Sequence, residues 1–201
     1  MPVYNITTFL PEIILALLGL GVLVLDLVLR GEHRRLLPAV TVAGLAAYGV
    51  AAGSLWDPAH MPAFEFWHSM LLDNYAVFFK VLFAAVGILV VLLATDFLRR
   101  VYAYGEFFVL LVFTLLGMSL LSGAVDLVTI YLAFELVSLS SYVLAGYLRR
   151  DPRSNEAGLK YFLYGASASA VMIYGMSLLY GLGGSTNLLV LSDRLAMNPV
   201  G

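Results

Sequence analysis

The chain has 201 residues, of which 62% are hydrophobic and only 12% are charged, with a formal net charge of -2 and a mean hydropathy of +0.94. Soluble domains carry about 25% charged residues, so this composition excludes an ordinary soluble domain. It also excludes a nucleic-acid-binding role, because the charges lie almost wholly at segment ends and form no basic face.

The side chains that hold redox cofactors are missing from this sequence. Cysteine is absent, which rules out disulfides, thiolate-held iron–sulfur clusters and Cys-ligated zinc within the chain. The three histidines, His33, His60 and His68, fall in connecting segments, which excludes a bis-histidine haem inside a bilayer. We therefore expect no cofactor and no metal here, and any associated redox chemistry must take place on another chain.

Six apolar segments predict an all-α fold, a polytopic transmembrane helix bundle that forms one membrane domain over residues 1–187. About twenty apolar residues, at a rise of ~1.5 Å each, cross a hydrocarbon layer of ~30 Å. The start lacks the basic region and cleavage site of a secretory signal, so the first segment is interpreted as a retained helix. Residues 188–201 are too short and too polar to cross and are expected to lie at the surface. The predicted helices span about 11–29, 36–56, 74–95, 105–122, 126–148 and 156–182.

The links between the predicted helices alternate in charge. Those after the first, third and fifth helices contain arginines, and the other two contain neither Lys nor Arg. By the positive-inside tendency this pattern places the N-terminus outside and the basic links in the cytoplasm. The link over 57–73 is too polar to span, and its Trp67 suits the membrane interface. The arginines concerned are Arg30, Arg34 and Arg35, then Arg99 and Arg100, then Arg149, Arg150 and Arg153.

A carboxylate near the middle of the fifth predicted helix is the first candidate for chemistry. Tyr131, Glu135, Ser138 and Tyr142 follow the i−4, i, i+3, i+7 spacing that places side chains on one helix face. A charge at that depth is costly and is usually functional. We therefore expect Glu135 to transfer protons, with the other three as path-lining groups.

The sixth predicted helix has a matching polar face with a base. Lys160, Tyr164, Ser167 and Tyr174 share that face, so an acid and a base stand on neighbouring helices. Counting residues from the cytoplasmic helix ends places Glu135 and Lys160 about 12 Å apart along the helix axes. This offset favours two separate proton-binding residues on one path over a direct salt bridge. Lys160 is the second expected proton-transfer residue, with Tyr164 and Ser167 as possible path-lining groups. In the structural alternative these side chains only join helices and satisfy one another.

Other charges and small residues have plainer interpretations. Lys80 lies one and a half turns into the third helix, where it can snorkel to the outer surface, with a transport role as the less favoured alternative. Asp26, Asp96 and Asp126 lie at helix ends, where we expect water or nearby arginines as partners. Glu12 and Glu156 suit first turns of helices. Close-packing positions are expected at Gly49, Gly53, Gly165, Ser169 and Gly175.

Two motifs carry a resemblance to a known family. They are Phe134-Glu135-Leu136-x-Ser138-Leu139-Ser140-Ser141-Tyr142 and Glu156-Ala157-Gly158-Leu159-Lys160-Tyr161-Phe162-x-x-Gly165-Ala166. With Pro11-Glu12-Ile13-Ile14, Gly105-Glu106-Phe107-Phe108 and the stretch from Leu179 to Asn187, they make the chain similar to the antiporter-like membrane subunits of respiratory complex I, the proton-pumping NADH–quinone oxidoreductase, and especially to subunit N.

The resemblance implies a non-redox membrane subunit that carries protons while electrons pass from NADH to quinone elsewhere. The family's glutamate on the fifth helix maps to Glu135 and its sixth-helix lysine to Lys160. NADH, flavin, iron–sulfur clusters and quinone would be held by partner subunits, and the partners of this chain would be other membrane subunits and lipid. Family members have a later half with further channel lysines that this sequence lacks, so we expect a truncated chain ending at Gly201.

Two alternatives stay open at this point. A subunit of a multisubunit cation/proton antiporter or membrane-bound hydrogenase would show the same two motifs. A purely structural membrane scaffold would hold charges that only satisfy each other. The sequence contains no residue pattern that demands a quinone head group.

Overall fold

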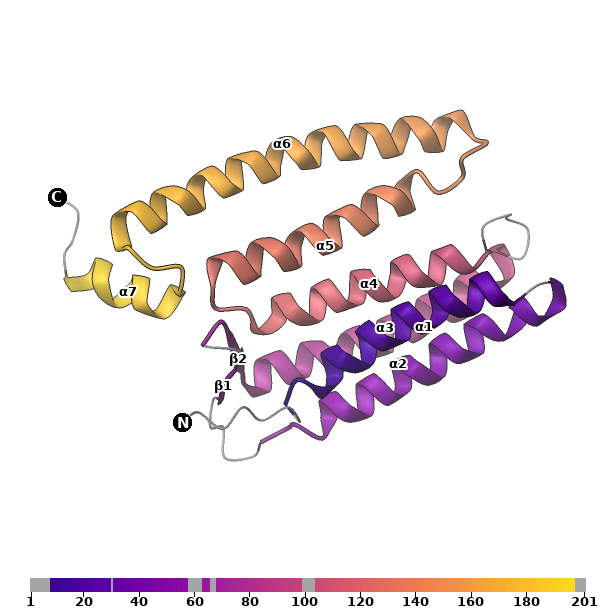
Figure 1. The fold of residues 1–201 in the computed structure, drawn as a ribbon, viewed down its shortest axis with the longest axis horizontal. Helices are drawn as coiled ribbons and strands as arrows, with labels where there is room; N and C mark the ends of the chain where they lie inside the picture. The colour runs from indigo at the N-terminus through magenta and orange to yellow at the C-terminus, as the bar shows by residue number, and fades with distance from the viewer. Residues whose placement is uncertain (1–7, 30, 58–62, 66–67, 99–103, 198–201) are drawn as a thin grey trace.

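The computed structural model describes residues 8–29, 31–57, 63–65, 68–98 and 104–197, and long helices dominate it (Figure 1). Within these ranges six helices are long and apolar enough to cross a membrane. This confirms the predicted all-α transmembrane bundle. The six are α1 (Leu10–Val28), α2 (Leu37–Gly53), α3 (Asn74–Leu98), α4 (Tyr104–Gly123), α5 (Leu127–Ala145) and α6 (Pro152–Gly183).

Three small elements complete the described chain. A 3-10 turn, η1 (Gly31–Leu36), precedes α2, and a short helix, α7 (Leu188–Met197), follows α6. Strands β1 (Ala63–Glu65) and β2 (Met70–Leu72) form an antiparallel pair with Phe64 opposite Leu71. These strands were not predicted, because the sequence shows no strong alternation of apolar and polar residues here. Trp67 and the arginines Arg30, Arg99 and Arg100, to which we assigned interface and topology roles, lie outside the described residues.

Local sequence signals explain where the helices begin and end. Asp126 caps α5 by accepting hydrogen bonds from the backbone N–H groups of Val128 and Thr129, at 2.9 and 3.3 Å. Asp151 caps α6 in the same way through the N–H of Arg153, so α6 begins at Pro152 and not near Glu156 as expected. At its other end α6 stops at Gly184, whose positive φ of 63° suits glycine.

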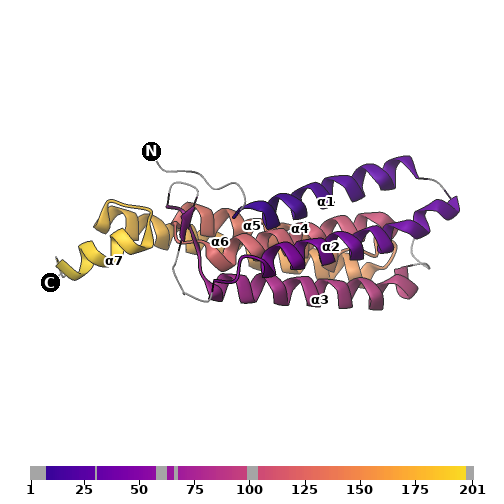
Figure 2. The same cartoon turned by 90° about the horizontal axis from the view of Figure 1, so that it is seen from below.

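Helices α1 to α4 pack against one another as a four-helix unit, and α5 and α6 are added to one side of it (Figure 1). Helix α5 lies on α4, and α6 lies on α5, so that α6 is the outermost helix. Seen from below, the long axes of the spanning helices run roughly parallel, and α7 extends beyond one end of the bundle (Figure 2). A bundle of this kind buries one stripe of each helix and leaves the other apolar faces for lipid.

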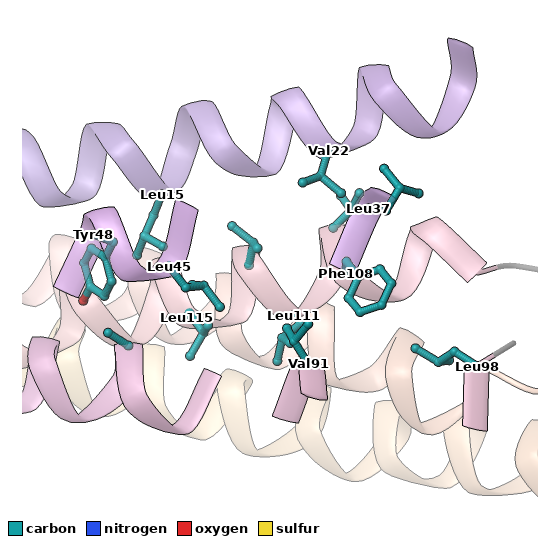
Figure 3. Packing of buried hydrophobic residues seen from close by; sticks show 13 residues of the cluster. Leu15, Val22, Leu37, Leu45, Tyr48, Val91, Leu98, Phe108, Leu111 and Leu115 are labelled. Carbon is teal, nitrogen blue, oxygen red and sulfur yellow. The ribbon is translucent and has the colours of Figure 1, made fainter. Parts of the chain in front are cut away.

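The hydrophobic core lies inside the four-helix unit (Figure 3). Leu15 and Val22 of α1 face Leu37, Leu45 and Tyr48 of α2, with Val91 of α3 and Phe108 and Leu115 of α4 closing the centre. The outer faces are apolar as well: Leu17 and Leu27 of α1 are 63% and 73% exposed. Such faces suit contact with acyl chains.

Small residues permit close approach at only some of the predicted positions. A Cβ at Gly49 would stand 3.0 Å from the Cβ of Ala84, so this glycine lets α2 and α3 approach closely. Ser169 is buried, as expected of a packing position. The expectation for Gly175 is wrong for the described chain, because no atom comes within 4 Å of a Cβ placed there.

Candidate functional site

Glu135 lies about two turns into α5 and is half-buried. Its Oε1 is fully shielded and has no hydrogen-bond partner among the described residues. Tyr131, one turn earlier on the same face, interacts with the Glu135 carboxyl. Ser138, which continues the face, is buried. A shielded carboxylate oxygen beside hydroxyl-bearing side chains is an arrangement that can bind water and pass a proton.

Tyr142 ends this polar face and fixes α5 against α6. Its ring packs edge-on against Tyr161, with centroids 4.9 Å apart, and against Phe162 at 5.8 Å. The Tyr142 hydroxyl occupies the space that a Cβ on Gly165 would need. Further along, a Cβ on Gly158 would stand 2.8 Å from the Cα of Gly146. The glycines of the second motif therefore set the distance between α5 and α6.

Lys160 does not face α5. Its side chain is 65% exposed and forms an ion pair with Glu156, one turn earlier on α6. The rest of the predicted stripe is open too: Tyr164 and Tyr174 are 77% and 65% exposed, and the Ser167 hydroxyl donates only to the carbonyl of its own helix. The α6 side that contacts α5 carries Gly158, Phe162, Gly165 and Ser169 instead.

The structure does not bring Glu135 and Lys160 together. Tyr142 is level with Tyr161 and Phe162, and the two helices run in opposite directions. Glu135 is seven positions before Tyr142. It is therefore displaced along the axis from the level of Lys160 by about 10 Å or more, at ~1.5 Å per residue. Within the described chain the partner of Lys160 is Glu156.

The links flanking α5 and α6 are held to each other by backbone hydrogen bonds. The N–H of Leu127 donates to the carbonyl of Thr186, and the N–H of Leu188 donates to that of Val125, both at 2.8 Å. The side-chain amide of Asn187 donates to the carbonyl of His68 at 2.6 Å. These hydrogen bonds thus join the start of α5, the end of α6 and the link between β1 and β2 at one end of the bundle. This end lies two turns of α5 from Glu135.

A second acid and base meet inside the four-helix unit, at a place that sequence reasoning missed. Lys80 Nζ of α3 lies 2.7 Å from Glu12 Oε1 of α1, and both side chains are almost completely buried. The prediction that Lys80 snorkels to the surface is wrong, because its helix face turns inward and a carboxylate receives it there. The Ser119 hydroxyl of α4 donates to the same Glu12 oxygen at 2.8 Å.

A tyrosine from α2 completes this buried cluster. Tyr48 is fully buried. Its hydroxyl lies beside Ser119 and in the field of Glu12. It nevertheless makes no well-formed hydrogen bond with the described residues, and neither does Glu12 Oε2. The four helices α1 to α4 thus each contribute one polar side chain to a single cluster, Glu12, Tyr48, Lys80 and Ser119.

Charges at the other end of the bundle have structural partners. Arg34 Nε stands 3.3 Å from Asp26 Oδ1, and Arg34 Nη2 donates to the Asp26 carbonyl, which confirms that Asp26 pairs with a nearby arginine. The Asp26 carboxylate fills the space beside Gly105, so only a residue without a Cβ fits there. Tyr147 packs edge-on against Phe107 nearby. Burial, followed by the field of Glu106, raises the pKa of Tyr147 to about 12.

Comparisons with known proteins agree with this arrangement. The family model described as NADH:quinone oxidoreductase/Mrp antiporter, TM, matches residues 124–199, which include Glu135 and Lys160. NADH-quinone oxidoreductase subunit N of Trichlorobacter lovleyi is 38% identical over 183 residues, covering 90% of this chain and 37% of the relative. The subunit N of Chlorobium chlorochromatii is 41% identical over 197 residues, covering 94% and 37%. The chain therefore spans less than two fifths of the length of these curated relatives.

Solved structures show the same fold. A chain of respiratory complex I from Thermus thermophilus with bound aureothin superposes with a TM-score of 0.73 at 28% identity, covering 93% of this chain and 42% of that one. The membrane-bound sulfane sulfur reductase, an archaeal respiratory membrane complex, gives a TM-score of 0.77 at 20% identity, a likeness of fold alone. By sequence and by fold, the comparisons confirm that the chain resembles the antiporter-like membrane subunits that include subunit N of NADH-quinone oxidoreductase.

Proposed function

We propose that this chain acts in a proton-translocating, non-redox membrane subunit of an NADH–quinone oxidoreductase, with other membrane subunits as neighbours. The observation that carries the proposal is Glu135, a half-buried carboxylate in the middle of a membrane helix. One of its oxygens is fully shielded and has no partner in the part of the chain that the structure describes. Placing an acid of this kind inside a membrane is energetically costly, and such residues are usually functional. The relatives named for this enzyme match the chain over nine tenths of its length.

Proton transfer is assigned to Glu135 and Lys160. Tyr131, Ser138 and Tyr142 are assigned as path-lining groups on α5, and Tyr164 and Ser167 on α6. The polar face of α6 is open in the described chain, so Lys160 would meet its working partners in the assembled complex. Electron transfer from NADH to quinone, with flavin and iron–sulfur clusters, would take place in partner subunits of the same bacterial membrane complex.

The test is proton pumping by the assembled complex in sealed membrane vesicles. Glu135→Gln keeps the size of the side chain but removes its proton-binding carboxylate, so NADH-driven proton uptake is expected to fall while the complex still assembles. Glu106→Gln is the matched control, because Glu106 is an exposed glutamate in the first turn of α4 whose partner, Arg149, is also exposed. Lys160→Ala is expected to lower proton uptake, and unchanged pumping in both Glu135→Gln and Lys160→Ala would favour a structural scaffold.

A second candidate, a subunit of a cation/proton antiporter or a membrane-bound hydrogenase, is favoured by one observation. The family model that matches residues 124–199 is described for the Mrp antiporter as well as for NADH:quinone oxidoreductase. Co-purification separates the two functions. NADH dehydrogenase activity and iron–sulfur proteins purifying with a tagged chain would support the proposed function, and their absence alongside Na⁺/H⁺ exchange would support the antiporter.

A further inference from the structure

The buried cluster of Glu12, Tyr48, Lys80 and Ser119 lies outside the range matched by the family model and shares no residue with the two polar faces on α5 and α6. It also differs from them in kind. The acid and the base are in direct contact at 2.7 Å, and both side chains are at least nine-tenths buried. In the ion pair of Lys160 with Glu156, by contrast, both side chains are exposed.

Stability alone is a weak reason for such a pair. Removing two charges from water carries a large desolvation cost, and replacing a buried ion pair by apolar residues of similar volume is often neutral or stabilising. The surroundings here are otherwise a leucine- and valine-rich core, with Leu15, Leu45 and Ala84 close by. Ionisable groups buried inside a membrane domain are usually functional, so this pair points to a functional role.

The cluster also has free hydrogen-bonding capacity pointing to a small polar ligand. Glu12 Oε1 accepts from Lys80 and Ser119, while Glu12 Oε2 and the Tyr48 hydroxyl are buried and have no hydrogen-bond partner among the residues described. Buried polar atoms almost always have a hydrogen-bond partner, and ordered water supplies it where protein groups do not. A water held between Glu12 Oε2 and Tyr48 would satisfy both atoms.

We propose that Glu12, Lys80, Ser119 and Tyr48 form a second, hydrated proton-exchange site inside the α1–α4 unit. The proton on Lys80 Nζ moves to the Glu12 carboxylate, so that an N–H bond breaks, an O–H bond forms and an amine stands beside a carboxylic acid. The net charge of the pair stays zero. Rotation of the carboxyl group presents this proton to water at Oε2, and the proton leaves as hydronium. The neutral amine takes one proton from an incoming hydronium ion, which becomes water. The ion pair is thereby restored, and one proton enters the site for each one that leaves.

The site is placed to communicate with Glu135 through α4. Ser119, which binds Glu12, is two positions from Gly117. A Cβ on Gly117 would stand 2.9 Å from the Ala133 carbonyl and 2.7 Å from Val137 Cγ2, so Gly117 packs against α5 on both sides of Glu135. Glu12 and Lys80 lie in the first two turns, and Glu135 near the middle, of helices that begin at the same end of the bundle.

This inference rests on the proposed function, and its test uses the whole complex in sealed vesicles. The main variant is Glu12→Gln/Lys80→Met, which replaces both charges and leaves no unpaired ion in the core. It is expected to assemble and to move fewer protons per NADH oxidised. Tyr48→Phe removes only the hydroxyl and is expected to slow proton uptake without affecting assembly. Glu106→Gln again serves as the matched control.

Infrared difference spectra of the complex during turnover report the protonation of carboxyl groups. A purely structural role of Glu12 would produce no protonation change in these spectra. The native complex is expected to show the C=O band of a protonated carboxylic acid that is lost in Glu12→Gln. Normal pumping by the double variant, or a spectrum that Glu12→Gln leaves unchanged, would overturn the proposal. Failure of every charge variant to assemble would also overturn it, because the pair would then be structural.

The same preparations distinguish this site from the one on α5. If Glu135→Gln pumps normally while Glu12→Gln/Lys80→Met does not, the assignment of Glu135 fails and the second site stands. If Glu135→Gln lowers pumping and the double variant pumps normally, the second site fails and the proposed function stands.

Discussion

Lys80 Nζ lies 2.7 Å from Glu12 Oε1, joining α3 to α1 inside the membrane domain. Because both side chains are nearly inaccessible to solvent, each charge mainly compensates the desolvation cost of the other. The stability of the four-helix unit therefore depends on whether the pair is complete, and not simply on whether charges are present.

Lys80→Met is the first prediction. The substitution leaves the Glu12 carboxylate buried without its cation and should lower the stability of the assembled protein by about 3–5 kcal/mol. The double variant Glu12→Gln/Lys80→Met removes both charges and should recover most of that loss. The measurement is the thermal unfolding midpoint in detergent. Equal loss in the single and double variants would contradict the pairing.

The sequence predicted the bundle but not this pair. Six apolar runs of sufficient length determine six spanning helices, because no other structure satisfies the backbone in lipid. The depth of Lys80 along α3 was readable, but the direction of its side chain depends on which neighbours pack there. One signal was available. Glu12 and Lys80 lie in the first two turns of odd-numbered helices, which begin at the same end of an alternating bundle.

The same limit applies to the predicted site. Helical spacing correctly placed Ser138 and Tyr142 on one buried face of α5. For α6 the spacing identified a polar stripe around Lys160, but it could not show that Gly158 and Gly165 would turn toward α5 instead. Packing of small residues decided that rotation, and the stripe was left exposed.

Gly117→Ala tests how α4 positions Glu135. The new methyl group would stand 2.9 Å from the Ala133 carbonyl, a backbone atom that cannot rotate away, and 2.7 Å from Val137. Helix α5 must move, at a cost of about 1–3 kcal/mol typical of overpacking. We expect lower thermal stability and lower proton uptake. Gly181→Ala is the control, since no atom of the described ranges lies within 4 Å of its Cβ position.

The proposed orientation predicts which links face the cytoplasm. The chain contains no cysteine, so single cysteines can be introduced without a background from this subunit. In right-side-out vesicles an impermeant maleimide should label Ser185→Cys and leave Arg150→Cys unlabelled, because basic links stay inside. Inverted vesicles should reverse the result. Labelling of Arg150→Cys from outside would place the N-terminus in the cytoplasm.

Asp126→Ala tests the cap of α5. The Asp126 carboxylate accepts from the N–H groups of Val128 and Thr129. Its loss leaves both donors unpaired at the helix start and should cost about 1 kcal/mol. Asp126→Asn keeps an accepting oxygen and should lose much less. The two thermal unfolding midpoints are compared in the same detergent, and equal shifts would show that the cap is not the cause.

Gly165→Ala tests the contact between α5 and α6 through a rescue. The Tyr142 hydroxyl occupies the place of the new methyl group, so α6 must shift or the tyrosine must leave its position. Assembly should fall in Gly165→Ala and recover in part in Gly165→Ala/Tyr142→Ala, because alanine removes both the hydroxyl and the ring carbons that meet the new methyl group. Gly175→Ala, in the same helix with open space around its Cβ position, should behave as native. A Gly165→Ala protein that assembles and pumps normally would mean that α6 does not depend on Tyr142 for its position.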